Sequence, residues 1–121
     1  MKLAFICHPL GATTQAQIAL NIKSAEKYAA HVLKLGYVPV VPHWYARILD
    51  DTKPEQRCLG IICANRLAGL CEVAFMCGDV ITSGMVVEIS VFKERHVPVA
   101  WICLEDNKLT IREDKDKICR I

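Results

Sequence analysis

Short apolar runs alternate along this chain with longer segments in which apolar residues recur every three or four positions. The short runs, bounded by glycine, proline or polar residues, are typical of buried strands, and the longer period is typical of helices. This alternation predicts an α/β fold with a parallel sheet and right-handed crossovers. The predicted strands are residues 3–6, 37–42, 73–76 and 97–103, and the predicted helices are residues 14–35, 54–70 and 85–95.

The first predicted helix has the clearest pattern. Thr13 or Thr14 can cap its start, and Gly36 stands where a left-handed C-terminal cap belongs. Five apolar residues form one stripe along it: Ile18, Ile22, Ala25, Ala29 and Val32. The residues expected to be buried in the second helix are Ile61, Ile62, Leu67 and Leu70.

The position of Pro39 predicts the order of the strands. A proline removes a hydrogen-bond donor, so the second strand should lie at an edge of the sheet. The order is then 2-1-3-4, as in a small flavodoxin-like or Rossmann-like three-layer sandwich with a parallel sheet of four to five strands. We expect residues 1–121 to form a single domain with a charged C-terminal extension, residues 104–121. Within the extension, residues 109–111 either add a short strand or fold against a partner chain.

The join between the third strand and the third helix carries the most chemistry. It contains Asp79, Thr82, Ser83 and Gly84, and it enters the helix at Met85. Open α/β sheets bind ligands beyond the carboxyl ends of their strands, and the start of a helix offers N–H groups and a positive dipole end to an anion. Thr82 and Ser83 can therefore donate to a phosphate or a sugar, although capping of the helix would alone explain Ser83.

Glu88 is unusual because it falls on the apolar arc of that third helix. On a helical wheel it lies between Val91 and Phe92, on the side that also holds Met85 and Ile89. Burial of a carboxylate is costly unless the group is paired, protonated or used. Glu88 is therefore either a partly buried side chain that caps a loop or pairs with an arginine, or a nucleophile or acid–base group at the floor of a cleft.

A second polar loop faces this join in the predicted sheet. It holds Cys7, His8, Pro9 and Gly11, and it follows the first strand, which neighbours the third strand at the switch point. The two loops should flank one crevice with Glu88 beneath it. His8 and His43 follow adjacent strands and can approach each other.

Composition and residue spacing exclude several classes of function. A net charge of +2 gives no electrostatic footprint for a nucleic acid polymer, and no segment is long and apolar enough to cross a membrane. Seven cysteines without a Cys-x-x-Cys pair argue against a zinc site or a disulfide framework and favour the reducing cytoplasm. The histidines are dispersed, and the first loop matches neither a dinucleotide fingerprint nor a P-loop, so neither a metal nor a cofactor is predicted. A nucleophilic Cys7 beside His8 lacks a third, orienting group, which favours a buried structural thiol.

What remains is a carboxylate beneath a rim that can bind an anion, which suits glycosyl transfer from a phosphorylated sugar through a covalent intermediate. At these residues the chain resembles the nucleoside 2-deoxyribosyltransferase-like superfamily, especially its small bacterial and phage branch, over about residues 2–103. The most specific part is Ser83-Gly84-Met85-x-x-Glu88. The matching segments are residues 5–11, 36–43, 81–89 and 97–99.

The resemblance implies an N-glycosidase or deoxyribosyltransferase in which Glu88 attacks the anomeric carbon of a (deoxy)ribosyl group. The base leaves, and water or a second base resolves the glycosyl-enzyme. The transferase branch has an aspartate six residues before the glutamate, where this chain has Thr82. A hydroxyl residue there is similar to the nucleoside 5′-monophosphate N-glycosidase branch, in which it contacts the 5′-phosphate. A second family acid is not evident: Ala64 and Asn65 lie near its expected place, and Asp79 would substitute for it only in part.

The resemblance also implies a nucleoside or nucleotide as ligand and a homodimer or larger homo-oligomer with shared sites. Thr82, Ser83 and Gly84 would bind phosphate or sugar, and the Cys7–Gly11 loop would line the base pocket. His43, Asp79 and Met85 complete the predicted substrate-binding set. Two other classes of function stay open. One is a binding protein that sequesters a nucleotide or an ADP-ribose-like molecule without chemistry, and the other is a structural oligomer without a ligand.

Overall fold

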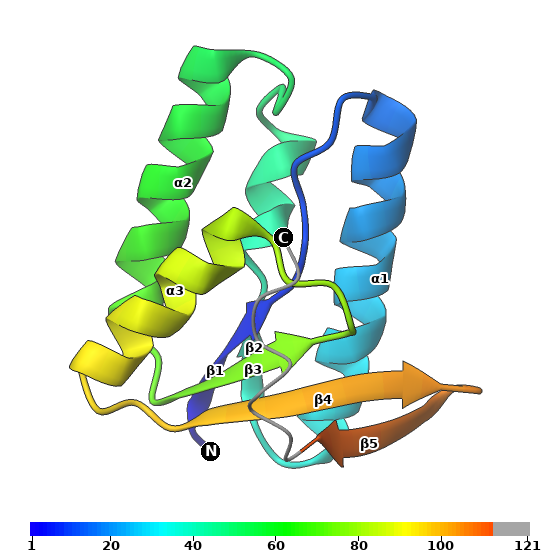
Figure 1. Cartoon of the computed structure of the whole chain (residues 1–121), viewed down its shortest axis with the longest axis vertical. Coiled ribbons are helices and arrows are strands. Elements are labelled where there is room, and N and C mark those ends of the chain that lie inside the picture. The colour runs from blue at the N-terminus through cyan, green and yellow to red at the C-terminus, as the bar shows by residue number, and fades with distance from the viewer. Residues whose placement is uncertain (113–121) are drawn as a thin grey trace.

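The apolar runs of the sequence form the strands of one β-sheet with helices on both faces (Figure 1). The computed structural model describes residues 1–112. Its strands are β1 (Leu3–Cys7), β2 (Val38–Val40), β3 (Val73–Cys77), β4 (Val99–Glu105) and β5 (Lys108–Arg112). Its α-helices are α1 (Gln15–Lys34), α2 (Pro54–Ala68) and α3 (Ser83–Glu94), and a 3-10 helix, η1 (Pro42–Arg47), follows β2.

The sheet has the order β2-β1-β3-β4-β5, which confirms the predicted order of the first four strands. The edge position expected for the proline-bearing strand is also confirmed, since β2 pairs with β1 alone. β1 lies between β2 and β3 and runs parallel to both, with Ala4 opposite Val73. The carboxyl ends of β1 and β3 are therefore neighbours at the switch point of the sheet.

The expectation of a purely parallel sheet is wrong at β5, which runs antiparallel to β4. The two strands are joined by Asp106 and Asn107, whose φ angles of 50° and 61° lie in the left-handed region. Two residues in this conformation form the tight turn of a hairpin, and a hairpin can only pair its strands antiparallel. Of the two fates left open for residues 109–111, a strand is the one observed. The rest of the charged extension, residues 113–121, lies outside the described residues.

Alternating strand residues divide the core between the two faces of the sheet. On one face Ala4 and Ile6 of β1 pack with Tyr28, Ala29 and Val32 of α1. On the other face the core cluster combines strand residues with α3 and the end of α2. Its fully or nearly buried members are Phe5, Cys7, Ala68, Cys71, Ala74, Met76, Ile81, Met85, Ile89, Phe92 and Trp101.

The expectations for α1 are confirmed. All five residues of its predicted stripe are buried, and Tyr28 joins them. The Thr14 hydroxyl accepts a hydrogen bond from the Gln17 N–H at 3.2 Å, so Thr14 rather than Thr13 is the cap. Gly36 has a φ of 96°, a left-handed conformation that favours glycine and ends the helix.

The burial predicted for residues of the second helix, expected over residues 54–70, is wrong for three of the four. Ile61, Ile62 and Leu70 are exposed, Leu67 is partly buried, and within the helix only Ala68 is fully buried. In Figure 1 the first turns of α2 lie beyond the ends of the strands, and only its last turns approach the sheet. No helix within residues 1–112 is long and apolar enough to cross a membrane.

Candidate functional site

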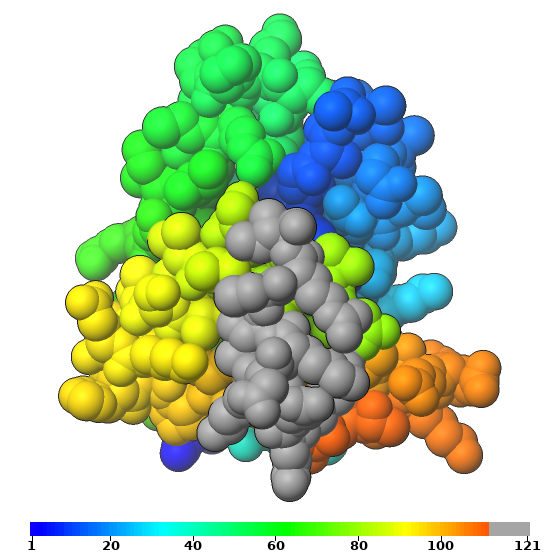
Figure 2. Space-filling model, viewed as in Figure 1, coloured from blue at the N-terminus to red at the C-terminus, as the bar shows by residue number. Residues whose placement is uncertain are grey.

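A cavity of about 440 Å³ lies beyond the carboxyl ends of β1 and β3. The loop after β1, η1, α2 as far as Asn65 and the start of α3 surround it. In Figure 2, α2 (green), the start of α3 (yellow-green) and the loop after β1 (blue) meet on one face of the molecule. The cavity thus occupies the place where open α/β sheets bind ligands.

Glu88 lies on α3 and lines this cavity. Met85 and Ile89, its neighbours on the helix, are buried in the core, and Glu88 itself is partly buried. Its side chain makes no hydrogen bond or ion pair within residues 1–112. Burial raises the pKa of Glu88 to about 7, so near neutral pH the carboxyl group exchanges readily between its protonated and ionised forms. A group of this kind can act as a nucleophile or in proton transfer.

The start of α3 forms a polar rim beside Glu88. Thr82 caps the helix, and its hydroxyl accepts a hydrogen bond from the Met85 N–H at 3.2 Å. The capping role considered for Ser83 therefore belongs to Thr82, and Ser83 is exposed at the cavity together with Gly84. Because the first N–H groups of a helix have no partner within the helix, this rim has the character of an anion site.

His8 and His43 come together as their positions after adjacent strands suggested. Their ring centroids are 5.7 Å apart, and the His43 Nε2–H donates to the carbonyl oxygen of His8 at 2.8 Å. His8 donates from Nδ1 to the Pro9 carbonyl at 2.8 Å, which leaves its Nε2 to accept from the Ser24 hydroxyl at 2.8 Å. Burial lowers the pKa of both rings, that of His43 to about 4, so both are neutral at pH 7.

The two histidines organise the wall of the cavity and do not form part of a larger ligand cluster. In the described part of the chain no group of three histidine, cysteine or acidic side chains is placed to hold a metal ion. The Nδ1 atom of His43 is buried and has no hydrogen-bond partner within residues 1–112. His43 therefore ties η1 to the loop after β1 through its other nitrogen.

Three predicted substrate-binding residues do not line the cavity. Cys7 is fully buried in the core, where burial raises the pKa of its thiol well above the ordinary value, as expected of a structural cysteine. Pro9 contributes its carbonyl oxygen to His8. Asp79 is exposed in the turn after β3. The predicted residues that do line the cavity are His8, Gly11, His43, Thr82, Ser83, Gly84, Met85 and Glu88.

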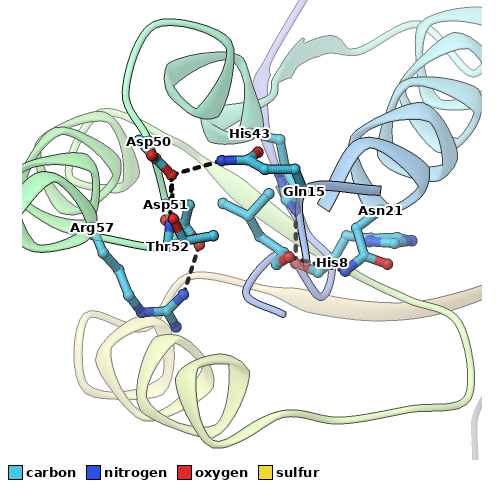
Figure 3. A network of polar contacts seen from close by, with 9 residues as sticks. His8, Gln15, Asn21, His43, Asp50, Asp51, Thr52 and Arg57 are labelled. Carbon is cyan, nitrogen blue, oxygen red and sulfur yellow. Dashed lines mark hydrogen bonds and ion pairs between the residues drawn. The ribbon is translucent and has the colours of Figure 1, made fainter. Parts of the chain in front are cut away.

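An ion pair between Arg57 and Asp51, which the sequence analysis missed, forms one side of the cavity. The Arg57 Nη1 donates to the Asp51 Oδ2 at 2.7 Å, and the Asp51 side chain is only 9% exposed. Neighbouring Asp50 accepts from Gln15 of α1 at 2.6 Å and from the backbone N–H of Thr52 at 3.0 Å, and Figure 3 shows the whole network. The only signal in the sequence is a cation in the first turn of a helix, where the helix dipole disfavours it.

Ala64 and Asn65, the residues near the expected place of a second family acid, also line the cavity. Among the described lining residues, Asp51 and Glu88 are the acids, and Asp51 is already paired. Apolar side chains cover the remaining wall: Leu10, Pro42, Tyr45, Ala46, Leu49, Ile61 and Val87. The cavity therefore combines one unpaired carboxyl group, a polar helix start and an apolar wall.

Fold and site together define an α/β domain whose cavity lies at the switch point of a mixed five-stranded sheet. Residues 2–102 match the family described as a domain of unknown function, DUF7768, and the chain belongs to this family. Neither the curated proteins nor the solved structures contain a match to the chain.

Proposed function

We propose that this protein cleaves or transfers the N-glycosidic bond of a nucleoside or nucleoside 5′-monophosphate, with Glu88 as the nucleophile. The observation that carries the proposal is the Glu88 carboxyl group, which lines a cavity of ligand size without a partner in residues 1–112. A buried structural carboxylate would be expected to have a hydrogen bond or an ion pair. The resemblance of Ser83-Gly84-Met85-x-x-Glu88 to the nucleoside 2-deoxyribosyltransferase-like superfamily supports the same role. As part of this proposal we also assign the domain to the flavodoxin-like folds.

The proposed reaction uses the Glu88 carboxylate as the nucleophile. A Glu88 oxygen attacks the anomeric carbon, the electron pair of the C–N bond passes to the base, and the base leaves after taking up a proton from solvent. The resulting ester is then attacked at the same carbon by water or by a second base, which releases Glu88 again as a carboxylate. The first step requires the ionised form of Glu88, and with a pKa of about 7 this form becomes dominant only above neutral pH.

The cavity offers separate surfaces to the parts of such a ligand. Ser83 and Gly84 at the start of α3 suit the phosphate or sugar. Leu10, Tyr45 and Leu49 suit the flat, mostly apolar faces of a base. As part of the same proposal, we expect a cytoplasmic homodimer or larger homo-oligomer whose subunits complete each other's sites.

A second candidate is a protein that sequesters a nucleotide or an ADP-ribose-like molecule without cleaving it. The observation in its favour is that Ala64 and Asn65 line the cavity near the place of the second family acid. A cavity that lacks this acid could keep its affinity for a ligand and lose its chemistry. Tight binding of an intact nucleotide would then be the property to measure.

Chromatography of a mixed pool of nucleosides and nucleoside monophosphates after incubation with the protein tests both candidates. We expect wild type to release free base and Glu88→Gln to release none while keeping its fold. Glu94→Gln is a matched control, because Glu94 is an exposed glutamate at the end of the same helix. Base release by Glu88→Gln at the wild-type rate would contradict the role of Glu88. Recovery of bound, intact nucleotide without turnover would favour the sequestering protein.

A further inference from the structure

We propose that Arg57 binds the phosphate of a phosphorylated ligand together with the start of α3, and so makes the site select nucleoside monophosphates over nucleosides. The inference rests on the proposed function in one respect, namely that the ligand carries a sugar and a base. Its core, an anion site built on Arg57, is tested by binding alone. No part of the sequence pattern or of the resemblance assigns a role to Arg57.

The position of Arg57 in α2 is not explained by the stability of that helix. Arg57 is the fourth helical residue, close to the positive end of the helix dipole, where a cation is unfavourable. Its ion pair with Asp51 neutralises a carboxylate that is only 9% exposed, while 47% of the Arg57 side chain stays accessible. The accessible part of the guanidinium is then available to a ligand in the cavity.

Gly11 gives the Arg57 guanidinium its space. A Cβ atom at position 11 would lie 2.8 Å from Cζ of Arg57 and 2.7 Å from its Nη2, closer than carbon and nitrogen atoms pack. The φ angle of Gly11 is not in the left-handed region, so the backbone itself does not require glycine there. The absent side chain therefore allows the guanidinium to lie directly against the loop after β1.

The Arg57–Asp51 pair presents the guanidinium to the cavity in a fixed orientation. Asp51 engages Nη1 from one side at 2.7 Å, and Gly11 lies against the same group. Figure 3 shows the Arg57 side chain extending from α2 to the side on which α3 lies. An arginine fork has five N–H donors, so a carboxylate on one nitrogen leaves others free to bind phosphate oxygens.

Two positive features of the cavity, the Arg57 guanidinium and the start of α3, can act on one anionic group. Among the described residues that line the cavity, Arg57 alone carries a permanent positive charge, and His8 and His43 are neutral at pH 7. Ser83 and Gly84 at the positive end of the α3 dipole line the same cavity. A phosphate bound between Arg57 and this helix start would place the attached sugar toward Glu88.

Isothermal titration calorimetry with the common nucleosides, their 5′-monophosphates and inorganic phosphate tests the proposal. Wild type should bind a monophosphate at least tenfold more tightly than the matching nucleoside. Arg57→Gln should weaken binding of the monophosphate by roughly tenfold to a hundredfold, the usual effect of losing hydrogen bonds to a charged group, and leave nucleoside binding unchanged. Gly11→Ala, which keeps the charge and displaces the guanidinium, should act in the same direction, and Arg57→Lys should lie between wild type and Arg57→Gln.

Arg66→Gln is the matched control, because Arg66 is an exposed arginine of the same helix that does not line the cavity. Equal effects of Arg57→Gln and Arg66→Gln, in variants whose circular dichroism matches wild type, would overturn the proposal. So would equal affinity of wild type for nucleoside and monophosphate. Arg57-dependent binding of monophosphates without release of base would leave this inference standing and contradict the proposed chemistry. Release of base from nucleosides without a preference for phosphate would support the proposed chemistry and contradict the role of Arg57.

Discussion

At the scale of single residues, the partly buried Glu88 and the buried His43 are titratable groups whose pKa values shift in opposite directions from their ordinary values. Burial raises the pKa of the Glu88 carboxyl to about 7 and lowers that of the His43 ring to about 4. In both cases the neutral form is favoured, as expected for groups removed from water. Each shift links the stability of the fold to pH with its own sign.

The Glu88 shift predicts a stability difference between wild type and Glu88→Gln that depends on pH. The folded protein binds the Glu88 proton up to a pKa of about 7, whereas an unfolded chain loses it near the ordinary carboxyl pKa of 4.5. The stabilisation from this proton is therefore complete below pH 4.5 and is lost as the pH rises through 7. By linkage the loss reaches about 3 kcal/mol, since one unit of pKa corresponds to about 1.4 kcal/mol.

Glutamine resembles the protonated carboxyl group and does not titrate. Urea unfolding should therefore give the same free energy for Glu88→Gln and wild type at pH 4.5, and a higher value for Glu88→Gln at pH 8. The exposed Glu94→Gln variant should show no such divergence. A gap between Glu88→Gln and wild type that stays constant with pH would mean that Glu88 does not titrate as described.

At the scale of elements, α3 and α2 are held together at one end and separated at the other. Arg95, just after α3, donates from Nη1 to the Ala68 carbonyl at 3.0 Å and from Nη2 to the Gly69 carbonyl at 2.8 Å. These carbonyls lie at the end of α2, where a helix leaves its last acceptors without partners. The starts of the two helices flank the cavity instead, so the closed end fixes the geometry of the open end.

The Thr82 cap predicts a stability effect that is separate from ligand binding. Thr82→Ala should destabilise the ligand-free protein by about 1 kcal/mol because the Met85 N–H loses its acceptor. Thermal unfolding should then occur about 4 °C lower. Thr82→Ser, which keeps the hydroxyl, should remain close to wild type. A neutral Thr82→Ala variant would show that the hydrogen bond does not stabilise α3 in solution.

The elements also show which parts of the structure a sequence can predict. α1 and β3 can be predicted from local patterns. The single apolar stripe of α1 identifies the face that packs on the sheet, and the uninterrupted apolar run of β3 identifies a strand that is buried on both faces. α2 is apolar on several sides, so its sequence does not identify the face that packs, and three of its predicted core residues are exposed. η1 and the β4–β5 hairpin depend on local turn geometry rather than on apolar periodicity.

The candidate site also has a part that the sequence predicts and a part that it does not. Glu88 and Thr82 belong to one strand–loop–helix unit, so the sequence alone placed them at the end of a strand. The Arg57–Asp51 pair and its contact with Gly11 join a loop, a helix and a second loop. Such contacts depend on the packing of separate elements, and no residue spacing in the sequence predicts them.

At the scale of the whole molecule, several of the exposed apolar residues lie on α2 and α3. Leu59 and Ile62 are spaced i, i+3 on α2, and Val87 and Val91 are spaced i, i+4 on α3, so each pair lies on one side of its helix. Their exposed fractions range from 40% to 63%. Exposed apolar groups of this kind mark candidate interfaces, and one of the four, Val87, also lines the cavity.

If these apolar residues form the interface of the proposed homo-oligomer, charged substitutions there should change the molecular mass in solution. Light scattering after size-exclusion chromatography should give the mass of a dimer or larger assembly for wild type. The double variant Ile62→Asp/Val91→Asp should give a monomer, because an aspartate at an apolar interface is left without a partner. Leu20→Asp/Leu33→Asp, at exposed positions of α1, should keep the wild-type mass. A monomeric wild type would contradict the proposed assembly.

The central position of β1 in the sheet has a consequence for folding during synthesis on the ribosome. β1 is the first strand to be synthesised, yet it needs β3 on one side, and residue 4 pairs with residue 73. At about 5–20 residues per second, the nascent chain carries this apolar strand for seconds before its central neighbour exists. Until then β1 can pair only with the short edge strand β2, so the fold cannot close from its N-terminus and must wait for the middle of the chain to emerge.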